Sequence, residues 1–415
     1  MKQVLIILFV LLINNLAYAT DWESSSDFRM GYVEYDYANP PSKTSSGRID
    51  SRGVYLSSKT SILTPKYQNF SLKATVAGVT DFGINNSEYE TRNYVFDNGD
   101  KSSFAIFQEF FISYLDETNN LTIGRQEIVT PLVESDDYYF IANSFDAINY
   151  INSSVNNFSF HLGYFYQMSG VWDSGANGTE FHSMSDSSFV DKKDKVNANN
   201  SGVVYGAVEY TDKNQRFKVW DYYTTDLYNM LFLEYIYSNS NSNFSYNLGF
   251  QIVNYKEVGA LASNNYTNID YSIFSIKFDG DLNSDLSFST AVTKYTNGEG
   301  QGATLGAWGG FPTYSYGLAH SFFNMGSLQN SMVSKIHISY DLESIGLTNT
   351  SLSYRYTNYA LDSVHSNSED YMILNGIKLS YSSSNGGYFK AIYEDRDLDN
   401  ADGAFAVRII GGYKF

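Results

Sequence analysis

The sequence predicts an all-β protein: a transmembrane antiparallel up-and-down β-barrel of 18 strands, forming one domain behind a short targeting segment. Three observations lead to this prediction. The chain is rich in aromatic and poor in charged residues, apolar and polar residues alternate along it, and short turns alternate with long polar loops. The alternating segments are about ten residues long, which suits tilted strands in a bilayer, whereas strands of soluble sandwiches commonly have about five or six residues.

The composition excludes several other classes. Of 415 residues, 17% are aromatic, 17% are charged and none is Cys. A helical membrane protein would exceed the mean hydropathy of −0.30, and a disordered chain would have fewer aromatic residues. A nucleic-acid-binding protein would be basic, but acids outnumber bases by 45 to 27, for a net charge of −18. A disulfide-stapled secreted scaffold would need Cys.

Residues 1–19 have the features of a cleaved secretory signal peptide. Lys2 provides the positive start, Val4–Ile13 is an unbroken apolar run, and Ala17-Tyr18-Ala19 matches the small-x-small cleavage pattern. The apolar run has about ten residues, too few for a membrane-spanning helix. We therefore expect residues 20–415 to be exported as a single barrel domain.

Period-two alternation marks the strands. It is clear in 244–254, in 158–168 with Phe165 as the exception, and in 404–415. Candidate strands begin near residues 28, 48, 68, 104, 119, 144, 157, 202, 215, 230, 243, 269, 284, 334, 350, 370, 387 and 404. The even count is typical of single-chain bacterial barrels. A further candidate at Tyr314–Phe323 would make the count odd, so we assign it to a surface loop or to an element folded into the pore.

The connections alternate in length. Short polar turns are predicted at 116–118, 211–214, 239–242 and 280–283, and long loops near 81–103, 127–143, 170–201, 255–268 and 296–333. Short turns at one end of a barrel and long loops at the other are typical of bacterial outer-membrane barrels. The alternative is a large secreted β-sandwich or β-helix with a tyrosine-rich surface.

The two faces of the strands predict where side chains point. Backbone groups in hydrocarbon must pair within the protein, so the sheet must close, with its aromatic face toward lipid and its polar face toward a water-filled lumen. A Lys or Arg facing lipid at the midplane would cost about 2–4 kcal/mol. We therefore expect polar and basic strand residues to line the pore wall: Arg52, His161, Arg216, Lys218, Arg355, Lys378, Lys390 and Arg408.

The last residue is a separate indication. The chain ends in an alternating strand with Phe415 in the aromatic register. A terminal aromatic strand of this kind looks like the signal read by the barrel-assembly machinery of the outer membrane.

One stretch resembles a known family. A strand at 107–112 is followed by Gly124-Arg125-Gln126, Thr130-Pro131-Leu132, Asp136-Asp137 and the segment 143–147. This order resembles the OprD-type porin family, which includes the major porins of campylobacter-like bacteria. Tyr139 stands where the family commonly has Arg, and Asp146-Ala147 replaces Glu-Gly. The resemblance implies an 18-stranded barrel whose third long loop folds into the lumen, and passive uptake of small hydrophilic solutes.

Loop 3, residues 127–143, is therefore the expected constriction. We expect it to place Glu127, Glu134, Asp136 and Asp137 in the passage, with Arg125 at its start. Lining charge sets selectivity in such pores, so these acids and the acidic net charge predict a preference for cations. The basic wall residues, Arg125 among them, could form a track for carboxylates, as the resemblance suggests, or could pair with inward acids and brace the wall.

A run of acids near the C-terminus allows two interpretations. Asp395, Asp397, Asp399 and Asp402 precede Gly403 with a spacing that resembles Ca²⁺ loops, but no Glu completes the twelve-residue pattern. A solvated acidic loop is favoured over a structural Ca²⁺ site that braces loops or bridges lipopolysaccharide phosphates. The sequence lacks a nucleophile elbow and paired metal-binding histidines, and 298–310 lacks the Lys-Ser/Thr of a phosphate loop. We predict no enzymatic activity and no obligatory cofactor.

Together these features predict a multi-pass outer-membrane porin for passive diffusion of small hydrophilic solutes. Its expected partners are outer-membrane lipid and lipopolysaccharide, the solutes, and the assembly machinery through Phe415, but not nucleic acid. Monomer and homotrimer both stay open. The alternative function is a surface barrel with a plugged lumen whose long loops serve adhesion or structure.

Overall fold

The computed structural model describes residues 22–37, 51–85, 103–135, 140–169, 181–186, 201–240, 244–263, 270–296, 308–318, 328–362, 370–399 and 403–415. The predicted signal peptide lies outside these residues, as do Asp136, Asp137 and Asp402. Within the described part, 18 strands follow one another around a single antiparallel wall, and a two-residue strand, β8 (His182–Ser183), pairs with β7 inside a long loop.

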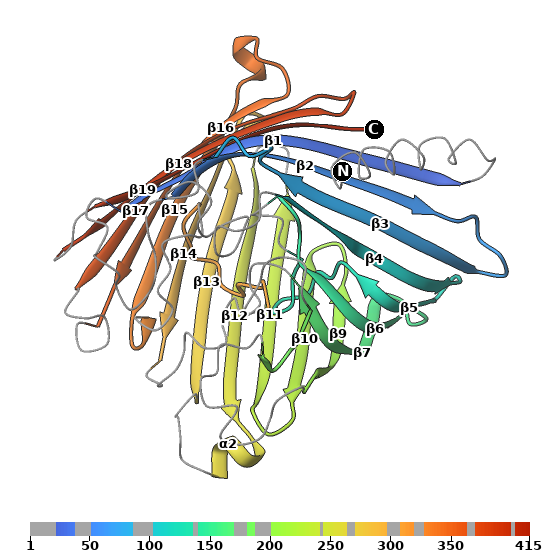
Figure 1. Ribbon diagram of the computed structural model, residues 1–415. Helices are drawn as coiled ribbons and strands as arrows, with labels where there is room; N and C mark the ends of the chain where they lie inside the picture. Colours follow the sequence, from blue (N-terminus) through green and yellow to red (C-terminus); the bar gives the residue numbers. More distant parts are fainter. Residues whose placement is uncertain are drawn as a thin grey trace.

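The strand order follows the sequence around the wall, as the colour gradient in Figure 1 shows. The barrel strands are β1 (Glu23–Tyr37), β2 (Ser51–Leu63), β3 (Phe70–Thr80), β4 (Ser103–Leu115), β5 (Asn119–Gln126), β6 (Ser144–Asn152), β7 (Phe158–Ser169), β9 (Val203–Thr211), β10 (Gln215–Thr224), β11 (Tyr228–Ser240), β12 (Ser245–Glu257), β13 (Tyr271–Asp281), β14 (Leu286–Tyr295), β15 (Met332–Asp341), β16 (Thr350–Ala360), β17 (Tyr371–Ser382), β18 (Gly387–Leu398) and β19 (Ala404–Lys414). Each of the 18 predicted strands coincides with one of these. The largest shift is at β1, which begins at Glu23 rather than near residue 28.

The barrel is closed by its first and last strands. β1 pairs with β19 in register from Asp27 opposite Lys414 to Tyr37 opposite Ala404. Beyond that ladder, Ser26 and Phe415 exchange two backbone hydrogen bonds of 2.7 and 3.0 Å, and the Phe415 ring stacks on Phe28. Closure gives every strand two neighbours, so the sheet has no open edge. The predicted all-β closed barrel is confirmed.

The outer face carries a belt of exposed apolar side chains. Phe110 on β4 is 63% exposed, and Leu162 on β7, Ile336 on β15 and Ile377 on β17 are half exposed or more. Such a continuous apolar surface suits contact with acyl chains. Two short helical elements, α2 (Gly259–Ser263) and η6 (Glu343–Ile345), lie in the connections. No helix in the described residues is long and apolar enough to span a bilayer.

The two ends of the barrel differ as the sequence predicts, with two exceptions. The predicted short turns all join strands at the end that holds both β1's start and β19's finish, and the long loops lie at the opposite end. The exceptions are 225–227, between β10 and β11, and 399–403, between β18 and β19, which are short connections at the long-loop end. At the short-turn end, backbone N–H groups of Thr118 and Asn119 donate to Asp116 at 2.9 and 2.7 Å, which holds the pKa of this carboxyl well below its ordinary value.

The core lies inside the barrel toward the long-loop end. Inward aromatic side chains of β6 to β10 stack in sequence there, for example Phe165 on Tyr205 at 4.6 Å and Tyr205 on Trp220 at 5.7 Å between ring centroids. Segments of the long loops pack onto them, so that Val133 and Trp308 are buried. Residues 308–318 form part of this interior packing. The sequence left the extra strand candidate at 314–323 as either a surface loop or an element folded into the pore, and its described part, 314–318, is folded into the pore.

Candidate functional site

Loop 3 folds inward and is attached to the wall at its start. Its first residue, Glu127, forms an ion pair with Lys59 of β2 and accepts a hydrogen bond of 2.9 Å from Gln108 of β4. Farther along, Leu132 and Val133 are buried, and the Phe140 ring lies 5.6 Å from Tyr55 on β2. The loop is therefore held in the lumen by charge at its start and by apolar packing along its length.

A second segment, residues 308–318, continues from loop 3 across the lumen. Val133 and Gly309 form a β-bridge, and Glu134 N–H donates to the Trp308 carbonyl at 2.9 Å. The Trp308 indole N–H in turn donates to the Met184 carbonyl at 2.9 Å. Three long loops therefore meet inside the barrel. We call 308–318 the inner segment.

Two inward acids anchor the far part of the inner segment. The Tyr314 hydroxyl donates to the Glu234 carboxylate of β11 at 3.0 Å, and Gln251 of β12 donates to the same oxygen at 2.8 Å. Leu318 N–H donates to the carboxylate of Glu394, which β18 holds in the interior. The segment thus runs along the inside of the wall from β11 to β18.

A row of inward cations lies on β13 to β19. Their strand registers place them on the lumen face, opposite the apolar belt. We call Lys277, Lys335, Arg355, Lys378, Lys390 and Arg408 the basic row. Four members were predicted, whereas Lys277 and Lys335 were missed. The alternation rule would have found both, because each is directly adjacent to an outward Ile: Lys277 follows Ile276, and Lys335 precedes Ile336.

The inner segment covers part of the basic row. The Lys277 ammonium lies 4.8 Å from the centroid of the Tyr314 ring and forms an ion pair of 2.8 Å with Asp279. The Arg355 guanidinium donates to the carbonyls of Tyr316 and Gly317, each at 3.2 Å. Both hydrogen bonds of Arg355 come from Nη1 and go to neutral carbonyls, so these contacts by themselves do not cancel its positive charge.

Lys378 is the uncovered member of the row. Its neighbours within electrostatic reach are Lys390 and Arg355, both cations. No carboxylate among the described residues forms an ion pair with Lys378, and its side chain is half-buried on the lumen face. Like charges held together in a partly buried wall attract anions from the lumen.

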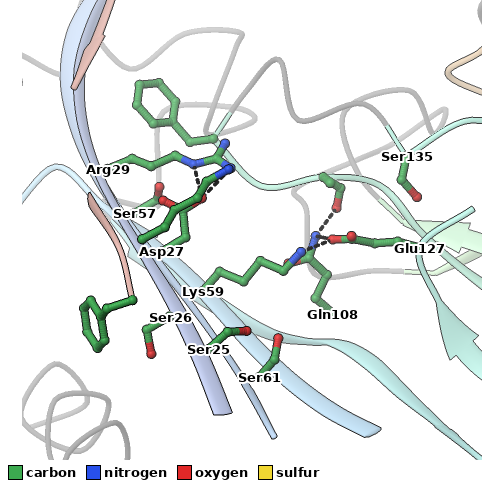
Figure 2. A pocket seen from close by; sticks show the side chains of 14 residues that line it. Ser25, Ser26, Asp27, Arg29, Ser57, Lys59, Ser61, Gln108, Glu127 and Ser135 are labelled. Atoms are coloured by element: carbon green, nitrogen blue, oxygen red, sulfur yellow. Dashed lines mark hydrogen bonds and ion pairs between the residues drawn. The ribbon is translucent and has the colours of Figure 1, made fainter. Parts of the chain in front are cut away.

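A polar cavity of about 560 Å³ lies beneath loop 3, toward the short-turn end (Figure 2). Its wall consists mainly of serine and charged side chains of β1 and β2, together with Gln108 of β4 and the end of the chain at β19, with loop 3 above. The lining residues are Ser25, Ser26, Asp27, Arg29, Ser57, Lys59, Ser61, Gln108, Glu127, Ser135, Phe140, Ala142, Lys414 and Phe415. Figure 2 shows two charge pairs facing each other across it: Arg29 with Asp27 at 2.8 Å, and Lys59 with Glu127. A small hydrophilic solute fits such a site in size and polarity.

This architecture was compared with known proteins. No family model and no curated protein sequence matches the chain. Solved structures do match over almost the full length. OccAB3 of Acinetobacter baumannii has a TM-score of 0.77 at 12% identity, covering 95% of this chain and 99% of that one. OpdK of Pseudomonas aeruginosa with vanillate has 0.74 at 12%, covering 95% and 98%, and a BenF-like porin of Pseudomonas fluorescens Pf-5 has 0.74 at 14%, covering 95% and 99%.

The chain has the OprD/Occ-type porin fold. The resemblance detected at 104–150 is therefore confirmed at the level of fold. Within this porin fold, Glu127 and Glu134 belong to the inward-folded loop 3, and Glu127 is paired with Lys59. Asp136 and Asp137, the other two expected acids, lie outside the described residues.

Two predicted lumen cations of this porin fold point outward. Arg125 lies opposite the exposed Phe110, so it shares the outer face, where it binds Asp146 at 2.9 Å and lies 3.5 Å from the centroid of the Phe181 ring. The reason is that β5 extends to Gln126, which gives Arg125 the parity of the outward Ile123.

Arg52 also departs from the expectation. It lies opposite Glu34 at the start of β2, in the register of the outward Leu56 and Met30. Both Arg52 and Arg125 lie at the long-loop end, beyond the apolar belt. The midplane penalty that we used to orient strand cations does not apply there.

The remaining predicted wall residues face inward. Lys218 pairs with Glu209 at 3.1 Å, which supports the bracing role for this cation. The His161 imidazole forms a hydrogen bond of 3.0 Å with Ser159 and lies 4.9 Å from the Trp220 ring. Arg216 lies near the short-turn end of β10 and is exposed; in the pairing of β10 with β11 it is directly opposite the inward Ile236, so it shares the lumen face.

The acidic run at 395–402 is only partly described. Asp395 accepts a hydrogen bond of 3.2 Å from Asn375, and Asp399 accepts one of 3.1 Å from the backbone of Asp370. In the part of the chain that the structure describes, no three acidic or histidine side chains gather to hold a metal ion. Because Asp402 lies outside that part, the choice between a solvated loop and a Ca²⁺ site stays a prediction.

Proposed function

We propose that this protein is an outer-membrane porin that passes small hydrophilic solutes down their gradients. Lys378 supports this function most directly: this cation forms no ion pair among the described residues and faces the interior of a closed barrel whose outer face is apolar. A purely structural barrel would gain nothing from an unpaired charge in its lumen, because such a charge destabilises the folded state unless water or a passing anion contacts it. The likeness to solved porins supports the same function, and none of those neighbours is an enzyme.

The basic row favours solutes that carry a carboxylate, free amino acids included. Lys378 forms no ion pair with an acid among the described residues, so a carboxylate that passes it gains Coulomb energy from this ammonium. The predicted cation preference rests on other groups, the loop 3 acids. Of these, Glu127 is already neutralised by Lys59, which weakens its effect on a passing ion. We retain cation preference as a separate prediction, tested by the sign of the reversal potential in a KCl gradient.

The test of pore function uses the purified, refolded protein in planar bilayers and in liposomes. A porin should give stepwise single-channel currents, and liposomes containing it should swell in amino acids and dicarboxylates faster than in neutral sugars of similar size. Absence of both current steps and swelling would refute the proposal.

The packed loops favour one alternative. Loop 3, the inner segment and residues 181–186 are joined inside the long-loop half of the barrel by the contacts of Val133, Glu134 and Trp308. If these contacts close the lumen completely, the protein is instead a surface barrel whose long loops serve adhesion or structure. A folded, bilayer-inserted barrel that conducts no current would support this function.

The partners follow from the same proposal. The apolar belt contacts membrane lipid, and the outward charges at the long-loop end would meet the polar headgroups of lipopolysaccharide. Phe415, paired with Ser26 at the seam, would be read by the barrel-assembly machinery before the seam closes. Cross-linking in native membranes distinguishes the monomer from the homotrimer.

A further inference from the structure

A bulge in β4 places an unusual residue beneath loop 3. Across the β3–β4 ladder, Thr75 is opposite Glu109 and Val76 is opposite Phe107, so Gln108 is the extra residue. A bulge breaks the alternation of side chains, and here it turns two consecutive residues inward. Gln108 is 1% exposed and Glu109 is 3% exposed, whereas Phe107 and Phe110 on either side face outward.

Glu109 has a local role in the wall. It forms an ion pair of 2.6 Å with Lys73 and accepts a hydrogen bond of 2.7 Å from Thr75, both on the neighbouring strand β3. Its contacts therefore hold adjacent strands together. Gln108 has no such partner on β3, and its contacts reach loop 3 instead.

Gln108 binds both ends of loop 3. Its side-chain amide donates to the Glu127 carboxylate at 2.9 Å and to the Ala142 carbonyl at 3.1 Å. Glu127 directly follows β5, and Ala142 lies two residues before β6. In addition, the Ser144 hydroxyl donates to the backbone carbonyl of Gln108 at 2.6 Å. One residue thus ties the first residue and the next-to-last residue of the loop to the same point of the wall.

We propose that Gln108 is a positioning residue that holds both ends of loop 3 against β4 and so sets the width of the passage beneath the loop. This inference rests on the proposed channel function. Two acceptors need two N–H donors, and among uncharged side chains only the amides of Asn and Gln offer two. Asn would be one methylene too short to reach both. An ionised Glu would donate to neither and would repel Glu127.

The contacts of Gln108 with loop 3 lie beside the polar cavity beneath the loop. Gln108, Glu127 and Lys59 all line the polar cavity, and Figure 2 shows Gln108 and Lys59 converging on the Glu127 carboxylate. Glu127 is therefore held between β2 and β4. Without the Gln108 amide, Lys59 alone would hold the start of the loop, and the Ala142 carbonyl would lose its donor.

The test combines a disruption with a rescue. Gln108→Glu puts two carboxylates in contact. The swap Gln108→Glu with Glu127→Gln restores an amide-to-carboxylate hydrogen bond, keeps the net charge and leaves Lys59 a carboxylate to pair with. Gln108→Leu removes the donors without adding charge. Gln126→Leu is the matched control: Gln126 is equally buried, but its amide donates to Gly124 and Ala147 carbonyls within the strand pair β5–β6.

Single-channel conductance and open-channel current noise are measured for each variant, and folding is checked by heat-modifiable migration on gels. We expect Gln108→Glu and Gln108→Leu to change the mean conductance or the noise by about twofold or more, because pore diameter governs conduction. The swap should return both toward the parent values, and Gln126→Leu should match the parent. Parent-like currents in folded Gln108→Leu would overturn the inference. A swap no better than Gln108→Glu would overturn the role given to the Glu127 contact, which is the contact that the swap restores. A parent protein without any current would instead refute the channel function.

Discussion

The unpaired cation on β17 leads to the sharpest prediction. Lys378 faces the lumen beside Lys390 and Arg355 and has no carboxylate partner among the described residues. Lys378→Met keeps the length and the apolar stem of the side chain while it removes one positive charge. We expect carboxylate permeation to fall and cation permeation to rise.

The size of the change follows from Coulomb's law. A solute carboxylate passing about 7 Å from the Lys378 ammonium gains about 0.6 kcal/mol at a dielectric constant of about 80 and about 1.2 kcal/mol at about 40. The half-buried position of Lys378 places the effective value between a dry wall and bulk water. Since 1.4 kcal/mol corresponds to tenfold, carboxylate permeability should fall by about three- to sevenfold relative to that of a neutral solute.

The assay is liposome swelling in acetate and glycerol, with reversal potentials at about 0.1 M salt, where the screening length is about 10 Å. The matched control is Lys294→Met on β14. It makes the same chemical change at an outward-facing residue whose ammonium donates to the Asn330 carbonyl at 2.7 Å. Equal effects of Lys378→Met and Lys294→Met, or no effect of the former, would show that the basic row does not act on the solute.

Three further predictions concern the loops and turns. Gly309 has φ = 86°, and a Cβ there would collide with the Glu134 carbonyl. Gly309→Ala should therefore separate the inner segment from loop 3 and alter the single-channel conductance. An unchanged current would contradict the role of this contact. Tyr314→Phe removes the hydroxyl that donates to Glu234 and should destabilise the folded barrel by about 1.5–3 kcal/mol. The measurement is the denaturant midpoint of unfolding in detergent, which should fall. An unshifted midpoint would count against the Tyr314–Glu234 hydrogen bond as an anchor of the inner segment. Folding lowers the pKa of Asp116, so this carboxylate should stabilise its turn at every pH above the ordinary value of 3.8 and lose its effect only as the pH falls through the lower folded-state pKa. The measurement is amide exchange in the turn, corrected for intrinsic rates. Exchange that already accelerates between pH 5 and pH 4 would contradict this prediction.

Some site residues could be predicted from the sequence because they lie in the middle of regular strands. Arg355, Lys378 and Arg408 alternate with apolar residues far from any bulge, and the penalty for a cation in lipid then decides which way they face. The same reasoning failed for Arg52 and Arg125. They lie near strand ends, where the outer face is no longer surrounded by hydrocarbon and an acid on the neighbouring strand can pair with them.

Bulges account for another part of what alternation could not predict. The sequence Gln108-Glu109-Phe110-Phe111 is compatible with two registers, and only the pairing with β3 shows that both polar residues point inward. A second irregularity, where β6 meets β7, lies next to Phe165, the residue that broke the predicted alternation. Phe165 proves to be a fully buried inward aromatic.

The sequence by itself determined the number and order of strands, the closure of the barrel and the face that meets lipid. These properties follow from a local period-two pattern and from the requirement that every backbone group in hydrocarbon be paired. Only the tertiary structure decided where loop 3 and the inner segment sit, which wall cations they cover and that Gln108 binds both ends of loop 3. Those contacts join residues from different loops and strands, such as Trp308 with Met184 and Leu318 with Glu394, and no local pattern in the chain encodes them.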